Sequence, residues 1–375
     1  MSTDSTLPVP APSFAPRLLR QRILLETVAS AILGRGDHPD RLARVARWSE
    51  RLDAHHPQTA EGARPLMELE ADRATPELVA ALTDGYRRPI VIRGLARAHA
   101  AVRRWTPDYF AERLPDAECT VFRPNEEVGF GLGTAPLERL PVADFMKRVL
   151  DEPLYLNNST ELFALDPELV DELELSRVQD AVFGASLGTQ LFATQFFIGS
   201  QCVHSRLHQA VGGNAFMQVR GRKRWTFVDP IHTPRLMPIP GGSFYFTLSG
   251  HGGFRRRREL GLPPGLLAHI PRFETVLEPG DVLYNAPWWW HEVENLDPGT
   301  IGCAVRRMPP HGTISPSFRN LPAFTLASMY PARRVLAALV EAVGWLAGGR
   351  VSLMRRANRV LHERLHNSLS ERKAA

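Results

Sequence analysis

Two histidines lie in segments that stand out from the rest of this sequence. His208 is part of Phe197–Trp225, and His291 is part of Glu278–Asn295. Neutral imidazole is the commonest metal ligand among side chains, although a single histidine is more often an ordinary core or surface residue. Residues i and i+2 of a strand face the same side, so a histidine and a donor with that spacing can reach one metal. These residue types alone therefore do not establish a metal site at either histidine.

Cysteine chemistry is not expected. Cys119, Cys202 and Cys303 are too few and too scattered for a disulfide framework, and they lack the CxxC spacing of a structural zinc site. This cysteine usage predicts a reducing cytoplasm as the location of the protein.

The two segments resemble the cupin-like branch of the Jumonji-type (JmjC) iron(II)/2-oxoglutarate oxygenases. The most specific pattern is Pro279-Gly280-Asp281, followed by an apolar strand and then Trp289-Trp290-His291. Tyr86–Gly94 and Trp105–Tyr109 also resemble this branch, so the resemblance covers roughly residues 66–308. It implies a double-stranded β-helix, which is a form of jelly roll, with one iron(II) and 2-oxoglutarate as cofactors.

The resemblance implies that His208 and His291 are the two histidine ligands of the iron. Members of the family add an Asp or Glu two residues after the first histidine, and here that position is Ala210. A methyl group cannot ligate a metal. Two imidazoles without the acid leave an additional coordination position for a ligand that does not come from the protein.

The co-substrate residues are also implied by the resemblance. Lys223 corresponds to the residue whose ammonium group pairs with the distal carboxylate of 2-oxoglutarate, and Ser205 corresponds to a hydroxyl that supports the same carboxylate. Asn214 falls where the family pattern expects such a residue. Arg306 departs from it, because the asparaginyl hydroxylase of this branch has an Asn near the co-substrate at this position. Arg306 could itself pair with a carboxylate, so it joins Lys223, Ser205 and Asn214 as a candidate residue for holding 2-oxoglutarate.

The motif His208-Gln209-Ala210 is similar to that of the radical halogenases in the wider superfamily. Those enzymes have Ala or Gly in place of the acid, and chloride or bromide takes the vacated position. Halogenation of an unactivated C–H bond is therefore the sharpest hypothesis for this chain.

Three alternatives remain open. Water in the vacated position would support hydroxylation, and loss of the metal would leave a non-catalytic binding or scaffold protein. Another side chain could also replace the acid. His204 lies about 13 Å from His208 along a straight strand, too far to share a metal. The carboxylates that lie near the two histidine motifs in sequence are Asp229, Glu292 and Glu294.

The elements that position these residues change in character along the chain. Apolar spacing predicts helices over residues 17–33 and 40–54, and Thr75-Pro76 and Thr106-Pro107 are typical helix starts. Pro89–Ile92 is expected to form a short buried strand, and residues 136–185 to be mostly helix and loop. From about 190 to 308, short apolar runs broken by Gly and Pro predict a barrel or sandwich core.

These patterns predict a mainly β core with flanking helices. We expect a disordered arm over residues 1–16, N-terminal helices over 17–65, a cupin-like/JmjC domain over 66–308, and a C-terminal helical region over 309–375. The last region contains two apolar helical patterns, 332–347 and 350–367, which could mediate a homodimer.

Composition bounds the function further. The chain has 375 residues, of which 44% are hydrophobic and 23% charged, which excludes a wholly disordered or fibrous protein. The net charge of +5 comes with mostly arginine as the basic residue and with no aromatic-interleaved basic motif, so nucleic acid is not an expected partner. No segment is long and apolar enough for a transmembrane span. The expected substrate is a small molecule or a peptidyl group.

Overall fold

The structure is a computed structural model, and it describes residues 14–32, 38–55, 62–123, 137–184, 191–201, 203–210, 212–243, 246–254 and 265–307. The expected C-terminal helical region and its dimer contact lie outside these residues, as do residues 1–13 of the expected N-terminal arm.

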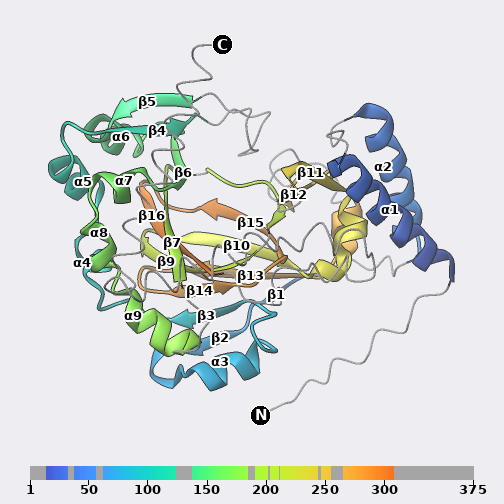
Figure 1. The fold of residues 1–375 in the computed structure, drawn as a ribbon, viewed down its shortest axis with the longest axis horizontal. Coiled ribbons are helices and arrows are strands. Elements are labelled where there is room, and N and C mark those ends of the chain that lie inside the picture. Colours follow the sequence, from blue (N-terminus) through green and yellow to red (C-terminus); the bar gives the residue numbers. More distant parts are fainter. Residues whose placement is uncertain are drawn as a thin grey trace.

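Two β-sheets form the centre of the described part of the chain (Figure 1). The first has the strand order β1-β13-β10-β15-β8-β12-β11, and the second has the order β2-β3-β14-β9-β16-β7-β6-β4-β5. This architecture confirms the predicted class, a mainly β jelly-roll core with flanking helices.

The strands of the first sheet are β1 (Ala63–Pro65), β8 (His208–Ala210), β10 (Lys223–Val228), β11 (Pro238–Ser243), β12 (Phe246–Ser249), β13 (Arg272–Leu277) and β15 (Trp290–Asn295). Those of the second are β2 (Glu68–Glu70), β3 (Ile90–Arg93), β4 (Glu118–Phe122), β5 (Leu137–Pro141), β6 (Tyr155–Ser159), β7 (Leu191–Gly199), β9 (Gly213–Arg220), β14 (Val282–Asn285) and β16 (Thr300–Arg307).

The helices are α1 (Phe14–Ile32), α2 (Pro39–Asp53), α3 (Pro76–Leu82), α4 (Ala100–Arg104), α5 (Pro107–Arg113), α6 (Val142–Arg148), α7 (Glu161–Leu165), α8 (Leu169–Glu172) and α9 (Leu175–Val178). Three short 3₁₀ segments are η1 (Ala71–Arg73), η3 (Pro230–Leu236) and η4 (Gly265–His269), and η2 (Gln179–Phe183) is a π-helical turn. None of the helices in the described ranges combines the length and apolar composition needed to cross a membrane.

Local sequence explains where several helices begin. The side-chain oxygens of Thr75 and Thr106 accept hydrogen bonds from the amides three residues later, at 3.3 and 3.1 Å, and a proline follows each threonine. This satisfies an amide that has no partner inside the helix. Helix α1 begins at Phe14, inside the segment 1–16 that was expected to be a disordered arm, so that boundary was placed too late.

The segment 136–185 differs from expectation in one respect. It contains α6 to α9, as predicted, but also β5 and β6, which extend the second sheet. Strand β6 pairs with β7, with a register shift between Asn157 and Ser159. A five-residue strand with polar residues in its second half gives almost no alternating pattern, and therefore periodicity did not reveal it.

Helices α1 and α2 form a hairpin that packs beside β11 and η3, at one edge of the first sheet (Figure 1). Apolar residues of this hairpin, Ile23, Val45 and Leu52, make a small core of their own. A buried ion pair joins the hairpin to η3, because Arg235 Nε donates to Asp53 Oδ1 at 2.8 Å.

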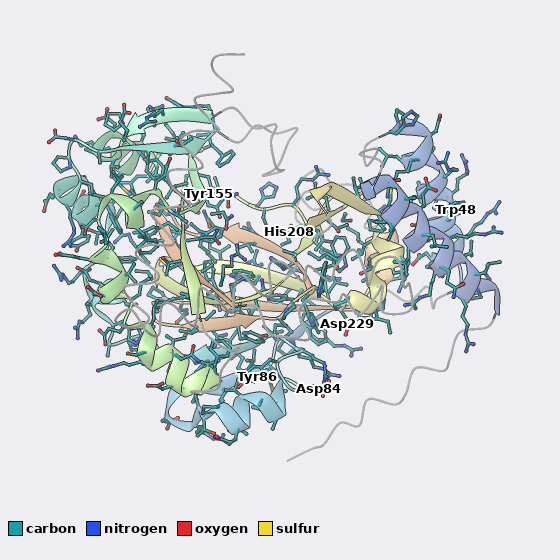
Figure 2. The ribbon with its side chains drawn as sticks, in the orientation of Figure 1. Trp48, Asp84, Tyr86, Tyr155, His208 and Asp229 are labelled. Atoms are coloured by element: carbon teal, nitrogen blue, oxygen red, sulfur yellow. The ribbon has the colours of Figure 1, made fainter. Side chains whose placement is uncertain are left out.

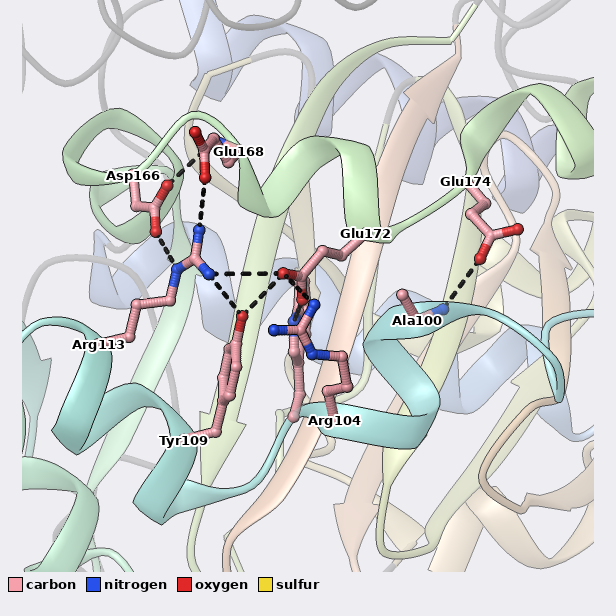
Figure 3. Close-up of polar contacts among 9 residues, drawn as sticks. Ala100, Arg104, Tyr109, Arg113, Asp166, Glu168, Glu172 and Glu174 are labelled. Carbon is pink, nitrogen blue, oxygen red and sulfur yellow. Dashed lines mark hydrogen bonds and ion pairs between the residues drawn. The ribbon is translucent and has the colours of Figure 1, made fainter.

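On the opposite side of the molecule, Glu172 of α8 accepts hydrogen bonds from the residue that follows α4 and from α5 (Figure 3). Trp105 Nε1 donates to one carboxylate oxygen at 2.6 Å and the Tyr109 hydroxyl donates to the other at 2.8 Å. Arg113 pairs with Asp166 in the same network. Because these side chains bond to one another, the cluster joins α8 to α5 and to the residue that follows α4.

Candidate active site

The two histidines selected from the sequence meet on neighbouring strands. His208 of β8 and His291 of β15 are direct register partners, and their ring centroids lie 4.1 Å apart with the planes inclined at 54°. Trp225 of β10 stacks against His291, with centroids 5.7 Å apart. The jelly roll thus brings together two imidazoles that are 83 residues apart in the chain. Figure 2 shows His208 near the middle of the molecule.

Backbone carbonyls fix the tautomer of both rings. His208 Nδ1 lies 2.7 Å from the oxygen of Arg206, and His291 Nδ1 lies 2.9 Å from the oxygen of Trp289. A carbonyl oxygen can only accept, so each Nδ1 carries the proton and each Nε2 carries the lone pair. Burial lowers the pKa of His208 to about 4 and holds the pKa of His291 well below its usual value. Both rings are therefore neutral at pH 7, the form that binds metals.

Ala210 lies on the same side of β8 as His208 and contributes to the same cavity. The three carboxylates that could replace the missing acidic ligand at position 210 make other contacts. Glu292 accepts from the Phe254 amide, Glu294 pairs with Arg224, and Asp229 accepts from the Ile231 amide. Within the described ranges, no group of three or more His, Cys, Asp or Glu side chains is placed to hold a metal.

A cavity of about 240 Å³ surrounds the two imidazoles. All the residues selected from the sequence line it: Ser205, His208, Ala210, Asn214, Lys223, His291 and Arg306. The other lining residues are Phe122, Tyr155, Asn157, Asn158, Phe197, Gly212, Phe216, Trp225, Asn285, Ala286, Val293 and Ala304. No aspartate or glutamate is among these lining residues, whereas one lysine and one arginine are.

Lys223 marks the closed end of this cavity. Its side chain is fully buried, and Nζ donates to Asn295 Oδ1 at 2.6 Å and lies 3.3 Å from Thr300 Oγ1. No carboxylate of the described residues pairs with it, and burial lowers the pKa of its ammonium group to about 7. The Ser205 hydroxyl, also in the lining, accepts from the Val293 amide at 2.9 Å and keeps its own proton to donate.

Arg306 lies toward the open end. Its Nε donates to Gln195 Oε1 at 2.5 Å and a terminal nitrogen donates to Asn158 Oδ1 at 2.7 Å. The Arg306 side chain is half-buried and Asn158 is exposed, so this contact lies at the rim of the cavity. Burial lowers the pKa of the guanidinium to about 10, and it remains charged at pH 7.

Three polar atoms of the cavity lining are buried without a hydrogen-bond partner in the described structure. They are Asn214 Oδ1, Asn285 Oδ1 and Trp225 Nε1. A buried polar atom without a partner is unfavourable by about 1–3 kcal/mol, and native proteins leave few of them. Their presence in this cavity, beside Lys223 and Arg306, fits a site that is completed by a polar, anionic ligand.

Sequence reasoning missed the wall of the cavity formed by β6. Tyr155 lies with its ring 5.8 Å from Lys223 Nζ, and Asn158 adopts a left-handed backbone conformation with φ of 55°. The available signal was Asn157-Asn158, since asparagine tolerates this conformation better than most residues. Without the strand assignment, nothing in the sequence connected that dipeptide with Arg306.

Comparison with known proteins places these features in a family. Residues 83–305 match the family described as Cupin-like domain. The chain is 35% identical over 115 residues to HSPB1-associated protein 1 of Rattus norvegicus, covering 28% of this chain and 22% of that protein. It is 26% identical over 245 residues to tRNA wybutosine-synthesizing protein 5 of Danio rerio, covering 60% and 70%.

A further relative is JmjC domain-containing protein E of Dictyostelium discoideum, at 26% identity over 186 residues, which cover 42% of this chain and 51% of that protein. The matches to HSPB1-associated proteins span less than a quarter of the length of those proteins. Together these matches support a 2-oxoglutarate-oxygenase-like fold.

Proposed function

This chain belongs to the cupin-like domain family, and from that premise we propose that it is an iron(II)- and 2-oxoglutarate-dependent oxidative enzyme acting on an unactivated C–H bond. The observation that carries the proposal is the pair of neutral imidazoles, His208 and His291, that converge on one cavity with their lone pairs on Nε2. Fold alone would not support an activity, because one fold hosts many functions.

The donors present fit a metal that takes two imidazoles from the protein. His208 and His291 would hold iron(II) through Nε2, while their Nδ1 protons remain on the backbone carbonyls and keep the rings oriented. When bound, iron with 2-oxoglutarate and O₂ supplies an oxidant strong enough to remove hydrogen from carbon. Ala210 leaves the third protein position to a ligand from solution.

Lys223, Ser205 and Asn214 are the residues we assign to 2-oxoglutarate. The Lys223 ammonium at the closed end can pair with the distal carboxylate, and the Ser205 hydroxyl can donate to the same group. Asn214 of β9 has an unsatisfied side-chain oxygen in the cavity lining and is the register partner of Arg306 on the neighbouring strand β16. A buried lysine without an acidic partner is unfavourable in the ligand-free protein, and a dianion would offset this.

Charge favours an anion, rather than water, in the position beside Ala210. Iron(II) and Lys223 together carry three positive charges, and 2-oxoglutarate carries two negative ones. Even with Arg306 at the rim left aside, one positive charge remains in a cavity that has no carboxylate among its described lining residues. Because an uncompensated buried charge is costly, a chloride or bromide would be stabilised there, and this supports halogenation over hydroxylation.

A non-catalytic scaffold is the second candidate. It is favoured by one observation, namely that the described residues contain no three-residue metal cluster of the usual ligand types. In that case the cavity would still bind a small anion through Lys223 and Arg306.

Anaerobic titration distinguishes these candidates. Purified protein receives iron(II) and 2-oxoglutarate without O₂, and the weak visible charge-transfer band of the chelate is recorded with and without bromide. The enzyme proposal predicts the band, and halogenation predicts that bromide shifts it. An Ala210→Asp variant, which restores the acid, should keep the band and lose the bromide effect. No band and no retained iron would favour the scaffold, and a band indifferent to bromide would favour hydroxylation.

A further inference from the structure

The cavity has two cationic poles, of which the proposed co-substrate needs one. Lys223 is fully buried at the closed end, whereas Arg306 is half-buried and touches the exposed Asn158 at the rim. Lys223 of β10 reaches the start of β16, where its Nζ lies beside Thr300, and Arg306 lies six residues further along β16. Of the two cations, Arg306 is therefore the one that is partly accessible to solvent.

The guanidinium of Arg306 retains capacity for a ligand. An arginine has five N–H donors, and the contacts to Gln195 and Asn158 use one on Nε and one on a terminal nitrogen. Both acceptors are neutral amide oxygens, and no carboxylate of the described residues pairs with this arginine. Arg306, His208 and His291 line the same cavity, so the guanidinium faces the space beside the two imidazoles.

Strand β6, which supplies the Asn158 oxygen that Arg306 of β16 contacts, is shaped for this contact. Strand β6 has a register shift around Asn158, where φ is 55°. A bulge re-aims a side chain, and backbone strain of this kind is concentrated at functional sites. Here it directs the Asn158 oxygen onto Arg306 and fixes the orientation of the guanidinium.

From this arrangement we infer that Arg306 binds a carboxylate group of the substrate at the mouth of the cavity. The inference rests on the proposed function, since it assumes that Lys223 serves the co-substrate. A planar guanidinium held by two neutral oxygens can take a carboxylate through two parallel hydrogen bonds. Iron(II) and Lys223 account for three positive charges of the loaded site, and Arg306 carries the fourth. A substrate carboxylate would neutralise this fourth charge. The substrate class is thus a small organic acid or a peptide with an acidic side chain.

Paired neutral and acidic probes test this inference by calorimetry. Protein loaded anaerobically with iron(II), 2-oxoglutarate and chloride is titrated with straight-chain monocarboxylates from acetate to hexanoate, each compared with its amide. Acetylated and amidated tripeptides with central Glu or Gln form the second arm. We expect an acid to bind about tenfold or more tighter than its amide. Binding of the free acids supports a small-molecule substrate, and binding of the Glu peptide alone supports a peptidyl one.

Variants test whether Arg306 causes the preference for an acid over its amide. Arg306→Gln should abolish this preference while leaving the affinity for 2-oxoglutarate unchanged, and Arg306→Lys should keep part of the preference. Asn158→Gly retains the backbone conformation but removes the orienting oxygen, and should weaken the preference even if Arg306→Gln folds poorly. Arg103→Gln, on the exposed surface of α4 outside the cavity lining, is the matched control and should change nothing.

Three results would overturn the inference: a wild-type protein that prefers no acid over its amide, a preference that survives in Arg306→Gln, or a loss of 2-oxoglutarate affinity in Arg306→Gln as large as that in Lys223→Gln. The proposed function fails separately. If neither iron nor 2-oxoglutarate binds, but the metal-free protein keeps an Arg306-dependent preference for acids, the anion site stands without the enzyme.

Discussion

Lys223 is the residue whose chemistry is most changed by the fold. Its ammonium group is fully buried, and its contacts within the described part of the chain are neutral oxygens of Asn295 and Thr300 and the ring of Tyr155. Burial lowers its pKa from 10.5 to about 7. The same side chain is therefore unfavourable for the ligand-free fold and available for an anion, which is the usual relation between stability and function at a binding site.

The affinity for 2-oxoglutarate should depend on pH through Lys223. Below pH 7 the amine is already protonated, whereas above pH 7 binding of the dianion must take up a proton. We expect the dissociation constant to rise by about tenfold per pH unit between pH 7 and 9. Calorimetry in buffers of different ionisation enthalpy measures both affinity and proton uptake. A Lys223→Arg control, which stays protonated, should give a flat profile, and a flat wild-type profile would contradict the assignment.

Lys223→Met should stabilise the ligand-free protein and abolish 2-oxoglutarate binding. The pKa of Lys223 is lower in the folded state than in the unfolded state, so the penalty is complete below pH 7 and disappears as pH rises toward 10.5. We expect the melting temperature to increase by about 2 °C or more at pH 6, and by less at pH 9. Equal increases at both pH values would show that packing, and not the charge, causes the effect.

At the scale of single elements, the sequence predicted what periodicity and caps can reveal. The helices at 17–33 and 40–54, the two threonine caps and the strands from about residue 190 onward agree with α1, α2, α3, α5 and the jelly-roll strands. Strand β6 was not predicted, because its five residues do not alternate and its pairing with β7 is a contact made only in the folded chain. Its residues Asn157 and Asn158 were missing from the predicted site for the same reason.

Strand β16 approaches the ring of Phe216, beside the Lys223 side chain, so closely that only glycine fits at position 302. A Cβ on Gly302 would lie 2.3 Å from Phe216 Cζ and 3.4 Å from Lys223 Cε. Gly302→Ala should therefore lower the free energy of unfolding by about 1–3 kcal/mol and weaken 2-oxoglutarate binding, as measured by urea denaturation and calorimetry. Gly62→Ala, where a Cβ meets nothing within 4 Å, is the control. Comparable losses in the two variants would contradict the packing argument.

At the scale of the whole molecule, the N-terminal hairpin is attached to the jelly roll next to the strands that lead to His208. The order β8-β12-β11 continues outward to α1, and the Asp53–Arg235 pair joins α2 to η3. Both charged side chains are almost completely buried, at 2% and 3% exposure. This arrangement could not be predicted from sequence, because the two residues are 182 positions apart.

Removal of one member of this pair should destabilise the protein strongly. Asp53→Ala leaves a buried arginine without its anion, and we expect a loss of about 3 kcal/mol or more. Glu26→Gln in the more exposed Arg44–Glu26 pair, with its 2.8 Å contact, should cost less than about 1 kcal/mol. Urea denaturation measures both variants, and similar losses would show that the hairpin is held by its apolar contacts instead.

The proposed halogenation depends most on which ligand occupies the iron-coordination position that Ala210 cannot fill. The measurement that tests this directly is anomalous diffraction from crystals grown anaerobically with iron(II), 2-oxoglutarate and bromide. We predict an iron peak between His208 and His291 and a bromide peak in contact with the methyl group of Ala210. An iron peak bound instead by a carboxylate from elsewhere in the chain, or no iron between the two imidazoles, would contradict the central claim.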